Sequence, residues 1–190
     1  ALAVAHALTG TVESALPLQR GAVERADATG DPYLTAQARL NLGFMAILQG
    51  DAPEAATLFE RAFEIASHAE LPWMAAAASI NLGHAWRRAG KHVEALGAYQ
   101  RGVRAMAEQG DTVSECAGSL GMISACAYLV DTQTMGHEMY RLDTRLAQLP
   151  FGAAQGLKSA FSSTLSALVM EGLAVPFEKL LTLARRYRLA

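Results

Sequence analysis

Aromatic residues are scarce in this sequence of 190 residues, at 7% of the chain, and most of its hydrophobic content of 52% comes from Ala and Leu. Ala and Leu are strong helix formers, whereas a β-sandwich takes β-branched and aromatic residues. The shortage of aromatic rings therefore argues against a β-sandwich. We predict an all-α protein of closely packed helices.

Long apolar runs are also missing. The nearest candidate, 71–82, is interrupted by Pro72 and by polar side chains, and it falls well short of the about 20 residues that a membrane-spanning helix needs. The chain begins at Ala1 without a Met, and no charged segment precedes an apolar one there. We interpret it as a piece of a larger protein without a signal peptide, and we expect a cytoplasmic location and no membrane contact.

Neither sign of charge dominates, because 16 Lys and Arg face 18 Asp and Glu, for a formal net charge of −2. A domain that neutralises phosphate groups is expected to be basic, so we expect no direct nucleic-acid binding by this segment. Arg185, Arg186 and Arg188 lie near the C-terminus. We interpret them as cations of a last helical turn, where exposed carbonyl groups favour positive charge.

Cysteine is nearly absent as well. Cys116 and Cys126 are the two that occur, ten residues apart in one predicted helix. That spacing corresponds to a rise of about 15 Å along a helix, whereas a disulfide needs Cα atoms within about 7 Å. We expect both to be reduced and buried, which fits a cytoplasmic protein.

The clearest pattern that the sequence does contain is an internal repeat. Residues recur at a step of forty, with Asn41, Leu42, Gly43 and Gly50 falling on Asn81, Leu82, Gly83 and Gly90. We therefore divide the chain into repeat units of about forty residues within a single domain, 1–190. The predicted units are about 1–30, 31–70, 71–110, 111–150 and 151–190.

Local signals divide each unit into two helices. Asp31 and Pro32 are typical of an N-cap followed by the first helical residue, and Gly50 is typical of a helix end. Asp51 and Glu54 then have the capping-box spacing. Between Pro32 and Gly50, an apolar stripe at helical spacing is formed by Leu34, Ala38, Leu42, Met45 and Leu48. Because each helix pair alone leaves an apolar face open to water, stacking of neighbouring pairs into a solenoid is expected.

The recurring residues resemble those of the tetratricopeptide repeat. They include a Leu-Gly pair in the first helix and an Ala, an aromatic and a small residue in the second: Leu42, Gly43, Ala46, Ala55, Phe59 and Ala62, then Leu82, Gly83, Trp86, Ala95, Tyr99 and Gly102. The resemblance implies a right-handed α-solenoid of stacked antiparallel helix pairs. The usual repeat has about 34 residues, and its helix-ending Pro is replaced here by Ser67 and Ala107. Such long repeats resemble those of bacterial LuxR-like activators of the maltose-regulon type and of peptide-sensing regulators.

The resemblance also implies where a ligand binds, because the first helix of each unit lines the concave side in that family. The predicted ligand- or peptide-binding residues are Gln37, Asn41, Phe44, Asn81, His84, Arg87, Arg88 and Tyr128, with Leu40, Ile47, Leu48, Ile80, Leu120, Ser124, Phe161 and Thr164 beside them. Asn41 and Asn81 have amides that can bond an extended peptide backbone, unless they only bond a neighbouring helix. His84, Arg87 and Arg88 form a cationic strip suited to an acidic ligand group, unless they are merely solvated.

One known subclass of the family is not matched. Chaperone-binding members hold a C-terminal carboxylate with two Lys, an Arg and two Asn. The equivalent positions here are Leu40, Phe44, Asn81, Ala117 and Gly121, of which Asn81 alone agrees. We therefore expect no carboxylate clamp and no binding to the C-termini of the Hsp70 and Hsp90 chaperones.

Catalytic and metal-binding patterns are not found either. The histidines His6, His68, His84, His92 and His137 show no pair at the spacing of a zinc-protease helix. We predict a non-catalytic module without metal or cofactor that binds a protein or peptide partner. We expect this module to be the interaction or sensor part of a bacterial transcriptional regulator or signalling protein. A self-assembling scaffold that forms a homodimer is the alternative, and a helical enzyme with a pocket between units is a weaker one.

Overall fold

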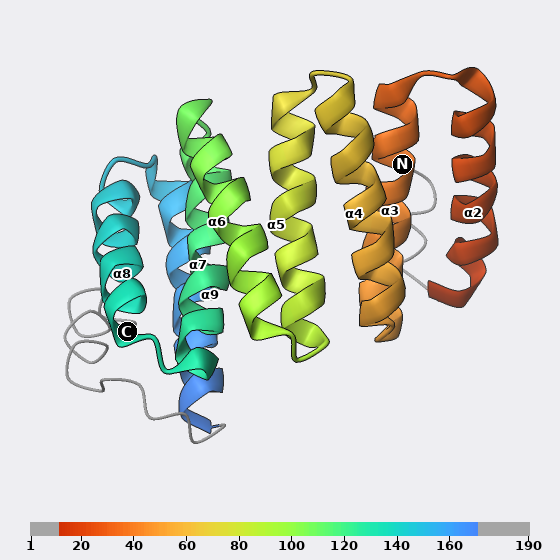
Figure 1. Cartoon of the computed structure of the whole chain (residues 1–190). Coiled ribbons are helices and arrows are strands. Elements are labelled where there is room, and N and C mark those ends of the chain that lie inside the picture. Colours follow the sequence, from red (N-terminus) through yellow and green to blue (C-terminus); the bar gives the residue numbers. More distant parts are fainter. Residues whose placement is uncertain (1–11, 171–190) are drawn as a thin grey trace. The chain divides into compact units, whose positions relative to one another are not determined.

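The computed structural model describes residues 12–170. Its elements are α2 (Val12–Thr29), α3 (Pro32–Gln49), α4 (Ala52–His68), α5 (Pro72–Arg88), α6 (His92–Glu108), α7 (Thr112–Leu129), α8 (Thr132–Leu146) and α9 (Phe151–Met170). Helices account for every regular element in this range, so the all-α prediction is confirmed (Figure 1). The chain forms two compact units, Ala1–Lys91 and His92–Ala190. The predicted roles of Arg185, Arg186 and Arg188 concern residues outside the described range.

The first unit contains α2 to α5, and each helix packs against the next one in the chain. α3 also contacts α5, so α4 covers two first helices that run in the same direction (Figure 1). Its core is built largely from alanines together with Met45 and Phe59, which are buried. Because Ala adds little bulk to a helix, these backbones can approach closely.

The helix boundaries follow the capping signals of the sequence. The Asp31 side chain accepts a hydrogen bond of 2.8 Å from the Tyr33 N–H, and Asp51 accepts one of 3.0 Å from the Glu54 N–H. Gly50 has a φ of 85°, the left-handed conformation that ends α3. Each cap satisfies donors or acceptors that a helix end leaves open. The predicted starts at Pro32 and after Asp51 are therefore confirmed.

The apolar stripe of α3 is buried at its centre only. Ala38, Leu42 and Met45 are buried, but Leu34 and Leu48 at its two ends are each 45% exposed. The two ends of the stripe therefore lie at the surface of the first unit, which places Leu48 where the predicted binding residues need it.

A glycine and an aromatic ring fix the spacing of α3 and α4. A Cβ atom placed on Gly43 would lie 2.6 Å from Cε1 of Phe59, closer than real side chains come. Phe59 is 2% exposed, so its ring has no free space into which it can move. The Leu-Gly pair and the aromatic residue of the repeat therefore form one contact, in which the ring occupies the place of the missing side chain.

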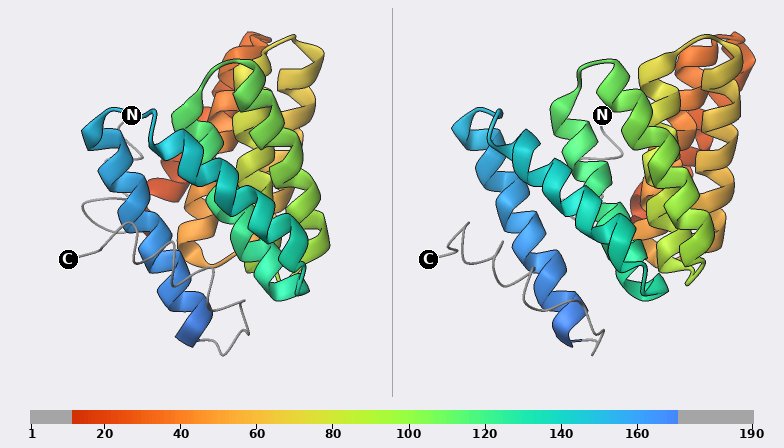
Figure 2. Two further views of the ribbon diagram at one scale, coloured as in Figure 1. Left: turned by 90° about the vertical axis from the view of Figure 1, so that its left-hand side faces the viewer. Right: turned by 60° about the vertical axis from the view of Figure 1, so that its left-hand side comes forward.

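The second unit contains α6 to α9, with α7 packed against α6, α8 and α9 (Figure 2). Nearly the whole of α7 from Glu115 to Ala127 is buried for this reason. Cys116 and Cys126 are free thiols in this helix, as predicted. Burial, reinforced by the charge of Glu115, raises the pKa of Cys116 to about 11, and burial raises the pKa of Cys126 to about 12. Both thiols are therefore protonated and unreactive at neutral pH.

Val130 ends α7 in the left-handed conformation, with a φ of 57°. Gly50, Gly90 and Gly110 also have a positive φ at the ends of their helices, but they carry no side chain. The left-handed region costs a residue with a Cβ about 1–2 kcal/mol, and a β-branched side chain such as Val tolerates it poorly. The Val130 side chain also lies in solvent, where it gains no packing.

We expect Val130→Gly to raise the free energy of unfolding by about 1 kcal/mol, because Gly removes this strain at a small cost in chain entropy. Urea unfolding followed by circular dichroism measures the change. The reciprocal variant Gly110→Val, at a φ of 73° with no atom within 4 Å, should lose stability. A Val130→Gly variant less stable than the parent would contradict the strain argument.

Candidate functional site

α3 and α5 present matching positions to the same side of the first unit. The two helices begin at Pro32 and Pro72, and they are parallel neighbours because α4 runs between them in the opposite direction (Figure 1). Residues forty apart in the chain therefore fall on the same turn of each helix. We call the partly exposed residues on this side the α3/α5 face: Gln37, Asn41, Phe44, Leu48, Ala77, Asn81, His84, Arg87 and Arg88.

Asn41 and Asn81 occupy the same position in this register, and both are half-buried. The Gln37 side chain donates a 3.2 Å hydrogen bond to Oδ1 of Asn41. The bond fixes the Asn41 amide within its own helix and leaves its NH₂ group as the donor that points away from that bond. In the described part of the chain, Asn81 forms no side-chain hydrogen bond. Bonding to a neighbouring helix, the alternative role for these residues, is not observed there.

The end of α3 adds an apolar area to this face. Phe44 is 44% exposed and Leu48 is 45% exposed, and they stand one turn apart on the helix. Their matching positions on α5 are His84 and Arg88. Toward the C-terminal ends of the two helices, the face is thus apolar on α3 and carries nitrogen-containing side chains on α5.

His84 differs from the prediction of a three-residue cationic strip. Burial, together with the charges of Arg87 and Arg88, lowers the pKa of His84 to about 4. The imidazole is therefore neutral at pH 7, and it supplies a hydrogen bond rather than a charge. The positive charge of the strip comes from the two arginines alone.

Arg87 is partly buried, and its Nε atom is buried without a hydrogen-bond partner among the described residues. Arg88 is exposed in the last turn of α5. Neither Arg87 nor Arg88 forms an ion pair within residues 12–170, so both guanidinium groups can bind the acceptor of a ligand.

Several residues predicted for the groove lie elsewhere. Leu40, Ile80, Leu120, Ser124 and Phe161 are buried, so they offer no surface to a ligand, and Leu120 and Phe161 belong to the core of the second unit. Tyr128 is half-buried in the second unit, where it packs on that core. Its ring stacks on His92 at a centroid distance of 4.1 Å. The other seven predicted binding residues, Gln37 to Arg88, lie together in the first unit.

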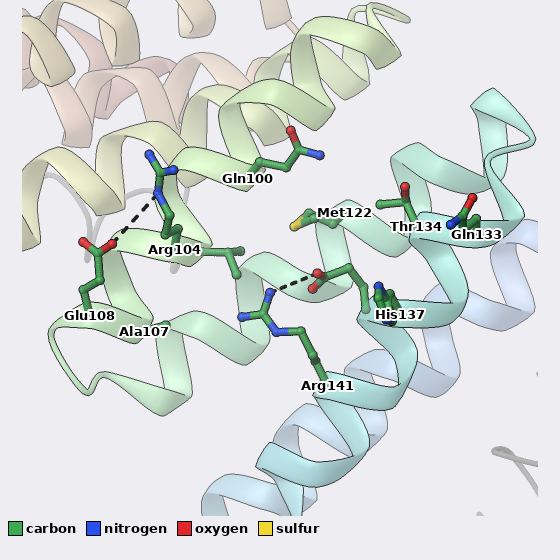
Figure 3. A pocket seen from close by; sticks show the side chains of 11 residues that line it. Gln100, Arg104, Ala107, Glu108, Met122, Gln133, Thr134, His137 and Arg141 are labelled. Carbon is green, nitrogen blue, oxygen red and sulfur yellow. Dashed lines mark hydrogen bonds and ion pairs between the residues drawn. The ribbon is translucent and has the colours of Figure 1, made fainter.

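A pocket of about 710 Å³ lies in the second unit, and no sequence pattern indicated it. Gln100, Arg104 and Glu108 line it from α6, Gln133, His137 and Arg141 line it from α8, and Met122 of α7 lies between them (Figure 3). Polar residues at a spacing of four are the usual pattern of a solvated helix face. The pattern does not reveal that two such faces border one hollow.

The charged groups at this pocket are already paired with one another. Arg141 donates to Glu138 and to Glu115, each at 3.0 Å. Ser119 donates to Glu138 at 3.1 Å, and Arg145 bonds Glu115 at 3.2 Å. Because two carboxylates balance two guanidinium groups, the pocket offers no uncompensated charge to a ligand. We therefore regard the α3/α5 face as the better candidate site.

Among residues 12–170 there is no group of three or more His, Cys, Asp or Glu that could hold a metal ion. No helix within the same range has the length and apolarity to cross a membrane.

The antiparallel packing of successive helices is the fold of a tetratricopeptide-like solenoid. A family model described as tetratricopeptide repeat matches residues 1–68. Such repeat folds are typical of protein-interaction modules and are generally non-catalytic. No curated protein sequence matches the chain.

Solved structures are similar in fold. BtubC (BKLC) from P. vanneervenii matches with a TM-score of 0.76 at 19% identity, over 98% of this chain and 77% of that one. A Podosopora anserina kinesin light chain structure with nearly identical TPR-like repeats matches with a TM-score of 0.74 at 17% identity, over 98% of this chain and 92% of that one. A Rap protein complexed with Competence and Sporulation Factor matches with a TM-score of 0.61 at 25% identity, over 93% of this chain and 48% of that one.

Proposed function

We propose that this chain is a non-catalytic module that binds a protein or peptide on its α3/α5 face. The observation that carries the proposal is the pair of half-buried amides, Asn41 and Asn81, on the same turn of two parallel first helices. One amide is fixed by Gln37. Such amides can donate to and accept from a peptide backbone without reading its side chains.

The spacing of the two amides suits an extended chain. Packed helices lie about 9 Å apart, and an extended peptide advances about 3.3 Å per residue. Asn41 and Asn81 would therefore contact backbone groups about three residues apart. The side chains between them would then fall on the apolar and cationic parts of the face.

We propose further that the module is the sensor or interaction part of a bacterial transcriptional regulator or signalling protein. The support is the resemblance of its long repeats to those of LuxR-like and peptide-sensing regulators, and the similarity in fold to a Rap protein complexed with Competence and Sporulation Factor. A repeat fold is compatible with many functions. The sequence of the complete protein tests this part, because a DNA-binding or nucleotide-binding domain beside the module would support it and a lone repeat array would contradict it.

Selection from a displayed random-peptide library tests the binding site. We expect wild-type protein to enrich peptides whose affinity falls by about 10-fold or more in the Asn41→Ala/Asn81→Ala variant, because two backbone hydrogen bonds are lost. Fluorescence anisotropy with the selected peptides measures the affinity. Thr57→Ala/Glu60→Ala is the matched control, since both residues are exposed on α4 of the same unit. A library that enriches nothing, or equal losses in both variants, would argue against the proposed site.

A further inference from the structure

Charge is segregated between the helices of the first unit. α3 and α5 contain no Asp or Glu, whereas α4 between them contains Glu54, Glu60 and Glu64. Arg39 of α3 is held by Asp27 at 2.7 Å, outside the α3/α5 face. The face is therefore cationic and free of carboxylates in a chain whose formal net charge is −2.

The two arginines of the face also differ from other arginines of the described chain. Arg20, Arg39, Arg61, Arg104, Arg141 and Arg145 each lie within 4.0 Å of a carboxylate. Arg87 and Arg88 have no such ion pair within residues 12–170, and the Nε atom of Arg87 is buried without a partner. A guanidinium group binds a carboxylate with two parallel hydrogen bonds. The guanidinium groups of Arg87 and Arg88 therefore lack the carboxylate partner that those other arginines have within the chain.

The apolar area lies beside these donors. Phe44 and Leu48 on α3 are matched in register by His84 and Arg88 on α5, and both apolar side chains are half-exposed. His84 is neutral at pH 7 and adds no positive charge. A ligand that crosses from α3 to α5 therefore meets an apolar surface first and two guanidinium groups next.

Resting on the proposed function, we propose that the ligand is an extended acidic peptide that places an apolar side chain on Phe44 and Leu48 and a neighbouring carboxylate on Arg87 and Arg88. The order of these groups along the peptide gives the ligand a direction across the face. The C-terminal carbonyl groups of α5 repel an anion, so the carboxylate is held by the guanidinium groups and not by the helix end. Exposed charge pairs are screened by salt, and binding should weaken as ionic strength rises.

Selection from the same peptide library, with Arg87→Gln/Arg88→Gln as the variant, tests this ligand class. We expect peptides enriched on the wild-type protein to carry Asp or Glu next to an apolar residue. Their affinity should fall at least about 10-fold in the double variant. It should also fall several-fold between about 50 and 300 mM NaCl, over which the Debye length shortens about 2.5-fold. Arg20→Gln/Arg61→Gln is the matched control, because it removes the same charge from exposed positions of the same unit.

The outcomes separate this inference from the proposed function. Enriched peptides without Asp or Glu, or acidic peptides that bind the Arg87→Gln/Arg88→Gln variant as tightly as the wild type, overturn the acidic ligand and leave peptide binding intact. A library that enriches no peptide overturns both. Arg88→Gln alone serves as a second variant if loss of Arg87 unfolds the protein, because Arg88 is exposed, and it should still weaken acidic peptides several-fold.

Discussion

Gly121→Ala should lower the free energy of unfolding of the second unit by about 3 kcal/mol, because forcing extra volume into a packed core displaces side chains and backbone. A Cβ atom on Gly121 would overlap the ring of Tyr99, whose hydroxyl oxygen would lie 2.8 Å from it. Tyr99 is fully buried, so the ring has no solvent-filled space to enter. Urea unfolding followed by circular dichroism measures the loss.

Two other glycines provide the control for this variant. A Cβ atom added to Gly97 in α6 or to Gly136 in α8 would have no neighbouring atom within 4 Å. Ala at either site should stabilise the protein by about 0.5–1 kcal/mol, because Gly is a poor residue for a helix interior. Combining Gly121→Ala with Tyr99→Leu should cost less than the sum of the two single changes. Additive losses would show that the ring contact is not the cause.

The glycine of the first unit could be predicted from the sequence, whereas Gly121 could not. Gly43 belongs to the repeated Leu-Gly pair, whereas its contact with the Phe59 ring is seen in the structure alone. The step of forty relates Gly43 to Gly83 and Phe59 to Tyr99, so it gives no indication that Gly121 of α7 contacts the Tyr99 ring. Position 123, forty residues after Gly83, is Ile123, which is a buried core residue. The contact of Gly121 with Tyr99 therefore follows from the packing of α7 on α6 and not from the repeated pattern.

The α3/α5 face, too, could be predicted from the sequence only in part. The family resemblance implies that Asn41, Asn81, Arg87 and Arg88 lie on the first helices that line one side. The charge of His84 could not be predicted in this way, because its pKa depends on burial and on arginines that the fold places next to it. The pocket between α6 and α8 depends on how far two helices diverge, which no residue pattern records.

Arg141→Met should lower the free energy of unfolding by about 3 kcal/mol, since removing one partner of a buried ion pair leaves a charge without compensation. The side chains of Glu115 and Glu138 are 3% and 8% exposed, and Arg141 bonds both of them. Met keeps much of the volume of the side chain without its charge. Arg145 remains beside Glu115, so Glu138 would lose its cation and keep the Ser119 hydroxyl.

Arg61→Met distinguishes this effect from the loss of an ordinary surface ion pair. Arg61 also bonds a glutamate, at 2.9 Å, but its side chain is 68% exposed, and such pairs contribute about 0–1 kcal/mol. Adding Glu138→Gln to Arg141→Met should restore part of the stability, because it removes the buried charge that has lost its partner. If Arg141→Met proves no more destabilising than Arg61→Met, or if Glu138→Gln adds a further loss, the charges around the pocket do not hold α7 and α8 together as the geometry indicates.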